Sequence, residues 1–216
     1  MKSLGLRYAL TGALAGGYLA LSATAYACGT GKILFEDKFE ALDPSWAVAA
    51  NVGSVGKDGL AVQSPANTVF NRLNQSSLYD NYEVCLTYSL QFADPQSNSA
   101  VAVLFWGVDT SNYYGFFTSP ISGSYALWRV QRGKWLNPIA WTPTPSVTKG
   151  AGASNEVSVK VVGNKGTLSV NNQKITDFTG MPPDNGSLIG FELDTGGNDK
   201  APSTLTVRDI QVREAQ

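Results

Sequence analysis

The sequence has 216 residues, with 16 Lys and Arg against 17 Asp and Glu, and it contains no histidine. The absence of histidine excludes Ser-His and Cys-His catalytic arrangements and His-liganded zinc or copper sites. Because there is no excess of basic residues, nucleic acid and anionic membranes are disfavoured as partners. The chain is rich in glycine (22 residues) and aromatic residues (11%) and poor in charge (15%). This composition disfavours helices and predicts an all-β protein.

The first 27 residues have the features of an export signal. Lys2 and Arg7 precede the apolar run from Tyr8 to Ala20, and Ala25-Tyr26-Ala27 gives the small-x-small pattern that signal peptidase cleaves. Glycines and a threonine interrupt the apolar run, which disfavours a transmembrane anchor. We therefore predict a signal peptide over 1–27, a single domain over 28–216, and a periplasmic or secreted location.

Two cysteines, Cys28 and Cys85, are present. An even number of cysteines in an exported chain predicts one disulfide. Lipidation of Cys28, which would be the first residue after cleavage, is the alternative. A lipoprotein signal normally has Leu three residues before that cysteine, whereas Ala25 stands there.

Short strands and turns follow one another along the rest of the chain, and no window of 11 or more residues has helical periodicity. A dozen short strands predict two antiparallel sheets packed as a jelly-roll sandwich. Turn residues at Arg132-Gly133, Gly163–Gly166 and Asn171-Asn172 predict hairpins. The predicted strands are Ile33–Phe39, Gly59–Gln63, Thr68–Leu73, Tyr82–Phe92, Ala100–Val108, Tyr113–Thr118, Ser124–Gln131, Lys134–Trp141, Glu156–Val162, Thr167–Val170, Leu188–Leu193 and Thr204–Val212.

The last predicted strand changes its hydrophobic parity. Leu205 and Val207 share one parity, whereas Ile210 and Val212 share the other. Either both faces of this strand are covered or a bulge lies near Arg208-Asp209.

Four segments resemble the concanavalin A-like lectin/glucanase superfamily: ILFEDKFEALDPSW, SNYYGFF followed by GSYALWRVQRGKW, NEVSVKVVGNKGTLSVNNQKI, and VRDIQV. Within that superfamily the chain is most similar to exported bacterial domains of the laminin-G-like and 3-keto-disaccharide-hydrolase-like type, from about Ile33 to Val212. The resemblance implies a jelly roll of two antiparallel sheets, one of them concave. Members of the superfamily bind sugars, hydrolyse glycans or serve as recognition modules.

The resemblance also implies where catalytic carboxylates would lie. Glycosidases of this superfamily carry Glu-x-Asp-x-Glu on one strand, so that alternate acids project into the cleft. The nearest match is Glu192-x-Asp194, which continues with glycine at the third position; Glu36-x-Lys38-x-Glu40 has lysine in the middle. The departure from the pattern argues against this mechanism, and we assign no catalytic residue.

A lyase that uses a tyrosine base and an arginine to hold a uronate carboxylate needs no histidine. Tyr113, Tyr114, Tyr125 and Arg129 supply these residue types, and Arg129 beside Trp128 would serve as an anion clamp. Their spacing does not fix a common geometry. Ordinary aromatic residues of a strand surface remain the simpler interpretation.

Carbohydrate binding needs only flat rings beside polar groups, because a pyranose ring stacks its C–H face on an indole or phenol. Aromatic residues are concentrated between Phe105 and Trp141. About half of them must face the core, and a one-residue slip in register would exchange the inward and outward sets. The predicted ligand-binding residues are Trp106, Tyr114, Trp128 and Trp135, with Asn112 and Arg129 as polar partners.

A structural calcium ion is the one cofactor that the resemblance suggests. Relatives often hold calcium between the first and last strands, and the matching positions are Glu36 or Asp37 and Asp209. Two carboxylates are a thin cage unless carbonyl oxygens complete it. The acidic loop 194–199 lacks the order of an EF-hand, which indicates a solvated loop.

These observations predict an exported glycan-recognition module that is not catalytic. A saccharide-acting hydrolase of the 3-keto-glycoside type and an envelope protein-interaction domain are the alternatives, because one fold supports several functions. A binding module predicts exposed, coplanar aromatic rings in an open groove. An enzyme predicts converging acids, either Glu192 with Asp194 or Glu83 with Asp109, and a protein-interaction domain predicts a flat apolar patch.

Overall fold

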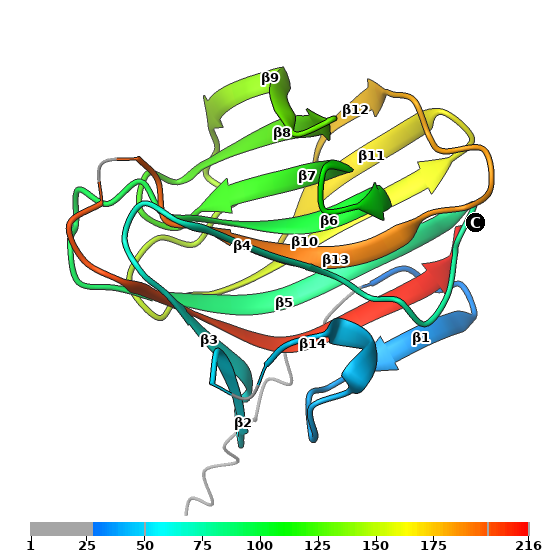
Figure 1. Ribbon diagram of the computed structural model, residues 1–216. Coiled ribbons are helices and arrows are strands. Elements are labelled where there is room, and N and C mark those ends of the chain that lie inside the picture. Colours follow the sequence, from blue (N-terminus) through cyan, green and yellow to red (C-terminus); the bar gives the residue numbers. More distant parts are fainter. Residues whose placement is uncertain (1–27, 50, 198, 216) are drawn as a thin grey trace, which may run out of the picture.

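Two antiparallel β-sheets packed face to face make up the fold (Figure 1). The computed structural model describes residues 28–49, 51–197 and 199–215, and the predicted signal peptide lies outside the described residues. One short 3₁₀ helix, η1 (Pro44–Trp46), is the only helical element among these residues. The fold is therefore the all-β jelly-roll sandwich that the sequence predicts.

The first sheet has eight strands in the order β12-β11-β10-β5-β14-β3-β2, and β1 pairs with β14 beside them. The first and last strands of the chain are thus neighbours, as the family resemblance implies. The strands of this sheet are β1 (Ile33–Asp37), β2 (Gly53–Gly56), β3 (Gly59–Ser64), β5 (Tyr82–Phe92), β10 (Ser154–Val162), β11 (Lys165–Val170), β12 (Gln173–Thr179) and β14 (Ser203–Glu214).

The second sheet has six strands in the order β4-β13-β6-β7-β8-β9. Its edge strand β9 curls at the top of the view in Figure 1, and its register with β8 shifts at two places. The strands are β4 (Val69–Leu73), β6 (Ala100–Asp109), β7 (Asn112–Ser119), β8 (Ser124–Gln131), β9 (Lys134–Pro143) and β13 (Leu188–Asp194).

All twelve predicted strands are present, with ends that differ by a few residues. The sequence analysis missed β2, which is only four residues long and begins and ends with glycine, and β12, whose side chains are mostly polar and exposed or half-buried. Both lie at edges of the eight-stranded sheet, where one neighbour suffices and a strong hydrophobic pattern is not needed.

The turn and bulge predictions are confirmed. Arg132, Gly133, Asn171 and Asn172 all adopt positive φ, as tight hairpins require. In β14 the register shifts between Val207 and Asp209, so a bulge explains the change of parity. Leu205, Val207, Ile210 and Val212 all reach the same core as a result.

A disulfide joins Cys28 to Cys85 in β5, as predicted. It ties the start of the described chain to the outer face of the eight-stranded sheet. A disulfide is typical of proteins that fold in an oxidising compartment. Among the described residues, no helix has the length and apolar character needed to cross a membrane.

The disulfide should contribute strongly to stability because its cysteines are 57 residues apart in the sequence. Closing a loop of this size lowers the entropy of the unfolded chain, so the Cys28→Ala/Cys85→Ala variant should lose about 4 kcal/mol in free energy of unfolding at most. Urea denaturation of the two proteins measures this difference. An unchanged urea midpoint in the double variant would show that the bond does not constrain the unfolded state.

Candidate functional site

The outer face of the six-stranded sheet carries a second hydrophobic cluster, separate from the core between the sheets. Strand alternation sends Val101, Val103 and Phe105 of β6 into the core and turns Ala100, Ala102 and Leu104 outward. The outward positions of the neighbouring strands are also small: β7 has Gly115, β8 has Ala126 and β13 has Gly190. These small residues leave room for large rings to lie across the strands.

Five rings cover this floor, and we call them the aromatic cover: Tyr113, Phe117, Trp128, Trp135 and Trp141. Trp128 is central, with ring centroids 5.2 Å from Trp135 and 6.2 Å from Trp141, both edge-on. Phe117 lies 5.4 Å from Trp128, and Tyr113 meets Trp135 edge-on at 6.3 Å. The rings thus pack mostly edge to face and do not form the coplanar row that was expected of a binding module.

The two outermost rings remain accessible. Trp135 is 41% exposed and Trp141 is 40% exposed, both on the edge strand β9, whereas Tyr113 and Phe117 beneath them are buried. The face therefore presents two indoles to solvent above a buried aromatic layer.

The six predicted ligand-binding residues divide between two places. Trp128 and Trp135 lie on the outer face, as expected. Trp106 and Tyr114 are only 3% and 5% exposed and pack with Phe105 and Phe178 in the main core, so their expected outward orientation is wrong.

Two local features explain this error. The pairing of β6 with β7 shifts after Phe105, and Trp106 adopts a positive φ of 47°, so a bulge sends two successive aromatic residues inward. In β7 the register is one residue from the expected one, which turns Tyr113 outward and Tyr114 inward. Sequence reasoning therefore missed Tyr113 as an outer-face residue and left Trp141 out of the selected set.

The remaining predicted residues line a groove at one end of the sandwich, which we call the end groove. Its volume is about 470 Å³, and its lining includes Trp106, Asn112, Tyr114, Arg129, Met181 and Asp184. Tyr113 and Val130 line it too, and both also belong to the outer-face cluster. The groove and the aromatic cover therefore adjoin at the end of the sheet, although Trp106, Tyr114 and Arg129 lie on the opposite face of the sheet from the cover.

A buried carboxyl group lies under the aromatic cover. Glu192 of β13 is 0% exposed, and the Tyr113 hydroxyl donates to its Oε2 at 2.7 Å. Asn71 Nδ2 in turn donates to that hydroxyl at 3.1 Å. Burial, and next the charge of Asp194 on the same face, raise the pKa of Glu192 to about 8, so the group is protonated at neutral pH.

The enzyme hypothesis required converging, accessible acids. Glu192 and Asp194 share the outer face, but Glu192 is enclosed, and burial also raises the pKa of Asp194. Glu83 lies in β5 of one sheet and Asp109 at the end of β6 in the other, so that pair does not share a face.

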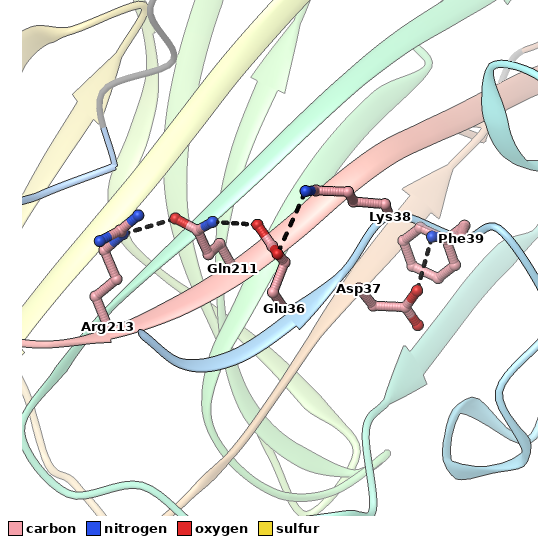
Figure 2. Close-up of polar contacts among 6 residues, drawn as sticks. All are labelled: Glu36, Asp37, Lys38, Phe39, Gln211 and Arg213. Atoms are coloured by element: carbon pink, nitrogen blue, oxygen red, sulfur yellow. Dashed lines mark hydrogen bonds and ion pairs between the residues drawn. The ribbon is translucent and has the colours of Figure 1, made fainter. Parts of the chain in front are cut away.

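Two of the three predicted calcium ligands, Glu36 and Asp37, are held by protein groups (Figure 2). Asp37 accepts from the Phe39 backbone at 2.7 Å and from Trp46 Nε1 at 2.8 Å. On the opposite face of β1, Glu36 accepts from Gln211 at 2.6 Å and pairs with Lys38 at 3.4 Å. Within the described ranges, no three His, Cys, Asp or Glu side chains gather as a metal site.

Asp209 has one buried carboxylate oxygen without a partner. Burial and then the nearby charge of Glu36 raise its pKa to about 6. Since Asp37 turns toward Trp46 and Glu36 toward Gln211 and Lys38, these three carboxylates do not converge, and the residues do not fit a calcium ion.

The buried carboxyl group of Glu192 should make stability depend on pH. Its pKa is about 8 in the folded chain and about 4.3 in an unfolded one, so between these values only the folded state keeps the proton. The free energy of unfolding should therefore fall as pH rises from 5 to 8, with all of this contribution present below the unfolded pKa.

Glu192→Gln removes this proton but keeps the shape of the side chain. Its slope of stability against pH should be shallower by about 1.4 kcal/mol per pH unit at most, measured by urea denaturation across that range. Glu40→Gln, at an exposed position, serves as the control. Identical slopes for wild type and Glu192→Gln would rule out a buried neutral Glu192.

Comparison with solved structures finds the same fold in sugar-binding and sugar-cleaving proteins. A carbohydrate-binding module, CBM66 from Bacillus subtilis, has a TM-score of 0.60 at 11% identity, covering 75% of this chain and 91% of that one. Bacillus licheniformis β-glucanase has a TM-score of 0.60 at 10% identity, with 86% and 100% covered. LamAcat from Zobellia galactanivorans has a TM-score of 0.61 at 10% identity, with 84% and 97% covered. At such identities the likeness concerns the fold alone.

Comparison with curated proteins finds no match. A family model does match, over residues 32–213, which is nearly all of the described chain. The chain has a concanavalin A-like jelly roll shared by carbohydrate-binding modules and glucanases, and it belongs to the 3-keto-α-glucoside-1,2-lyase-like domain family.

Proposed function

We propose that this protein is an exported glycan-recognition domain without catalysis, and that the aromatic cover of the six-stranded sheet is its saccharide-binding surface. The observation that carries the proposal is the exposure of Trp135 and Trp141, which flank Trp128 on one face. Indoles at a surface offer flat apolar area to the C–H face of a sugar. Apolar side chains that cluster at a surface mark interaction and ligand-binding sites.

Two unpartnered polar atoms on the same face support the proposal. The indole Nε1 of Trp128 and Oε1 of Glu192 are buried without a hydrogen-bond partner among the described residues. Buried polar atoms in native proteins nearly always have a partner, which is protein or water. A sugar that displaces the exposed rings would give the Trp128 N–H and the neutral Glu192 carboxyl group hydroxyl partners, directly or through water.

An enzyme of the kind that the family name describes is the second candidate. A 3-keto group acidifies the proton on carbon 2 of a glucoside, so a 1,2-lyase needs a base that removes this proton while the oxygen on carbon 1 leaves. Glu192, Asp194 and Tyr113 share one face and favour this candidate. Against it, Glu192 is enclosed and neutral, and a protonated carboxyl group is not a base.

The binding proposal predicts the effect of removing the exposed rings. Trp135→Ala and Trp141→Ala should each weaken binding of a neutral oligosaccharide by about tenfold, as expected for the loss of one stacking ring. A glycan array identifies the ligand, and isothermal titration calorimetry then measures the affinities. Leu34→Ala, which truncates an exposed apolar residue of β1 in the other sheet, should bind like wild type. Full affinity in both tryptophan variants would contradict the proposed surface.

The two candidate functions also differ in turnover. Incubation with a 3-keto-α-glucoside should release no product above the buffer rate, measured by chromatography of the free aglycone, because Glu192 is enclosed and burial raises the pKa of Asp194, the other acid of the face. Asp194→Asn and Glu192→Gln should give the same trace as wild type. Product formation that Asp194→Asn abolishes would establish the enzyme instead.

A further inference from the structure

The end groove contains an arginine whose side chain is poorly satisfied. Among the described residues, Arg129 makes no ion pair within 4 Å, and its one side-chain hydrogen bond goes from Nη1 to Met181 Sδ at 3.3 Å. Its Cζ also lies 5.2 Å from the centre of the Tyr114 ring. A guanidinium has five N–H donors, and a thioether is a weak acceptor. The groove therefore holds a positive charge with unused donors.

The same groove contains a second unused donor. The Trp106 indole Nε1 is buried and has no hydrogen-bond partner among the described residues. Trp106 is fixed by neighbours on several sides, with Tyr114 edge-on at 5.2 Å and Phe178 at 5.6 Å. The segment after β12 closes over it, since Gly180 lies directly against the indole and a Cβ there would collide with the ring.

The polar neighbours do not compete for these donors. The Asn112 side chain is already occupied, because its Nδ2 donates to Asp109 and its Oδ1 accepts from the Arg132 backbone. The Tyr114 hydroxyl accepts from the Met181 backbone at 3.2 Å. Asp184 lines the groove, but it makes no ion pair with Arg129 within the described residues.

We propose that the end groove binds the carboxylate of an acidic sugar, so that the protein recognises uronate-containing glycans. The guanidinium of Arg129 pairs with the carboxylate, as its planar fork allows, and the Trp106 ring forms part of the groove wall. Tyr113 and Val130 belong both to the lining of the groove and to the outer-face cluster, so a glycan bound at Arg129 lies beside the aromatic cover at the end of the sheet. This inference rests on the proposed function and names its class of ligand.

The test compares oligosaccharides that differ only in charge. Glucuronate, galacturonate and mannuronate oligomers are titrated into the protein beside their carboxyl-reduced counterparts, with affinities measured by calorimetry at constant salt. Wild type should bind at least one oligouronate about tenfold more tightly than its reduced form, as expected for a hydrogen-bonded charge pair. Arg129→Gln should abolish that preference, while Arg132→Gln in the adjoining turn should keep it.

Two further variants test the groove without removing Arg129. Trp106→Phe keeps a ring in the core and removes only a buried N–H, so it should keep the preference for uronate. Asp184→Asn removes a negative charge from the lining of the end groove and should raise the affinity for uronate. Their near-ultraviolet circular dichroism reports whether the fold is kept. If Arg129→Gln does not fold, the uronate site is tested by the affinities of wild type for charged and reduced oligosaccharides and by the effect of Asp184→Asn.

The outcomes separate this inference from the proposed function. Binding of neutral oligosaccharides that depends on Trp135, with equal affinity for charged and reduced forms, would overturn the uronate site alone. A preference for uronate that survives Arg129→Gln would do the same. Failure of every neutral and acidic oligosaccharide to bind would overturn both proposals.

Discussion

The aromatic cover depends on one constraint: successive side chains of a strand point to opposite faces of its sheet. In the six-stranded sheet both faces are apolar: one packs into the main core, and the other has its own hydrophobic cluster. No further layer of secondary structure covers that second face among the described residues. The sheet's own aromatic side chains must therefore cover it, and the last of these rings are left in contact with solvent.

Small residues make this cover possible. Alanine and glycine at the outward positions of β6, β7, β8 and β13 leave room for the rings of Tyr113 and Phe117, and Trp128 then packs against the two exposed indoles. The same crowding encloses Glu192 and keeps it neutral. The same packing thus leaves two indoles at the surface and places a neutral carboxyl group beneath them.

Most of the fold follows from patterns that are local in sequence. Val157, Val159 and Val161 alternate with polar residues, and Asn171-Asn172 supplies the positive φ of a turn, so strands and hairpins were predictable. The disulfide followed from an even count of cysteines together with the predicted export signal. The parity change in β14 located its bulge because aliphatic residues mark the core face on both sides of it.

The site was less predictable because aromatic residues occupy both faces of β7 and β8. In a segment such as Tyr113-Tyr114, hydropathy does not distinguish the inward ring from the outward one, and the bulge at Trp106 has no parity signal because Phe105 and Trp106 are both aromatic. Glu192 stood out only as part of an incomplete glycosidase pattern. Its burial depends on Tyr113, which comes from a strand 79 residues earlier.

The most direct test of the proposed binding surface follows the indole N–H signals of the five tryptophans in ¹H-¹⁵N spectra while an oligosaccharide that binds is titrated into the protein. If the aromatic cover binds the saccharide, the signals of Trp128, Trp135 and Trp141 should shift in a saturable way, whereas that of Trp46, buried in the core between the sheets, should stay in place. Saturable binding that leaves the N–H signals of the three outer-face indoles in place would contradict the proposed binding surface.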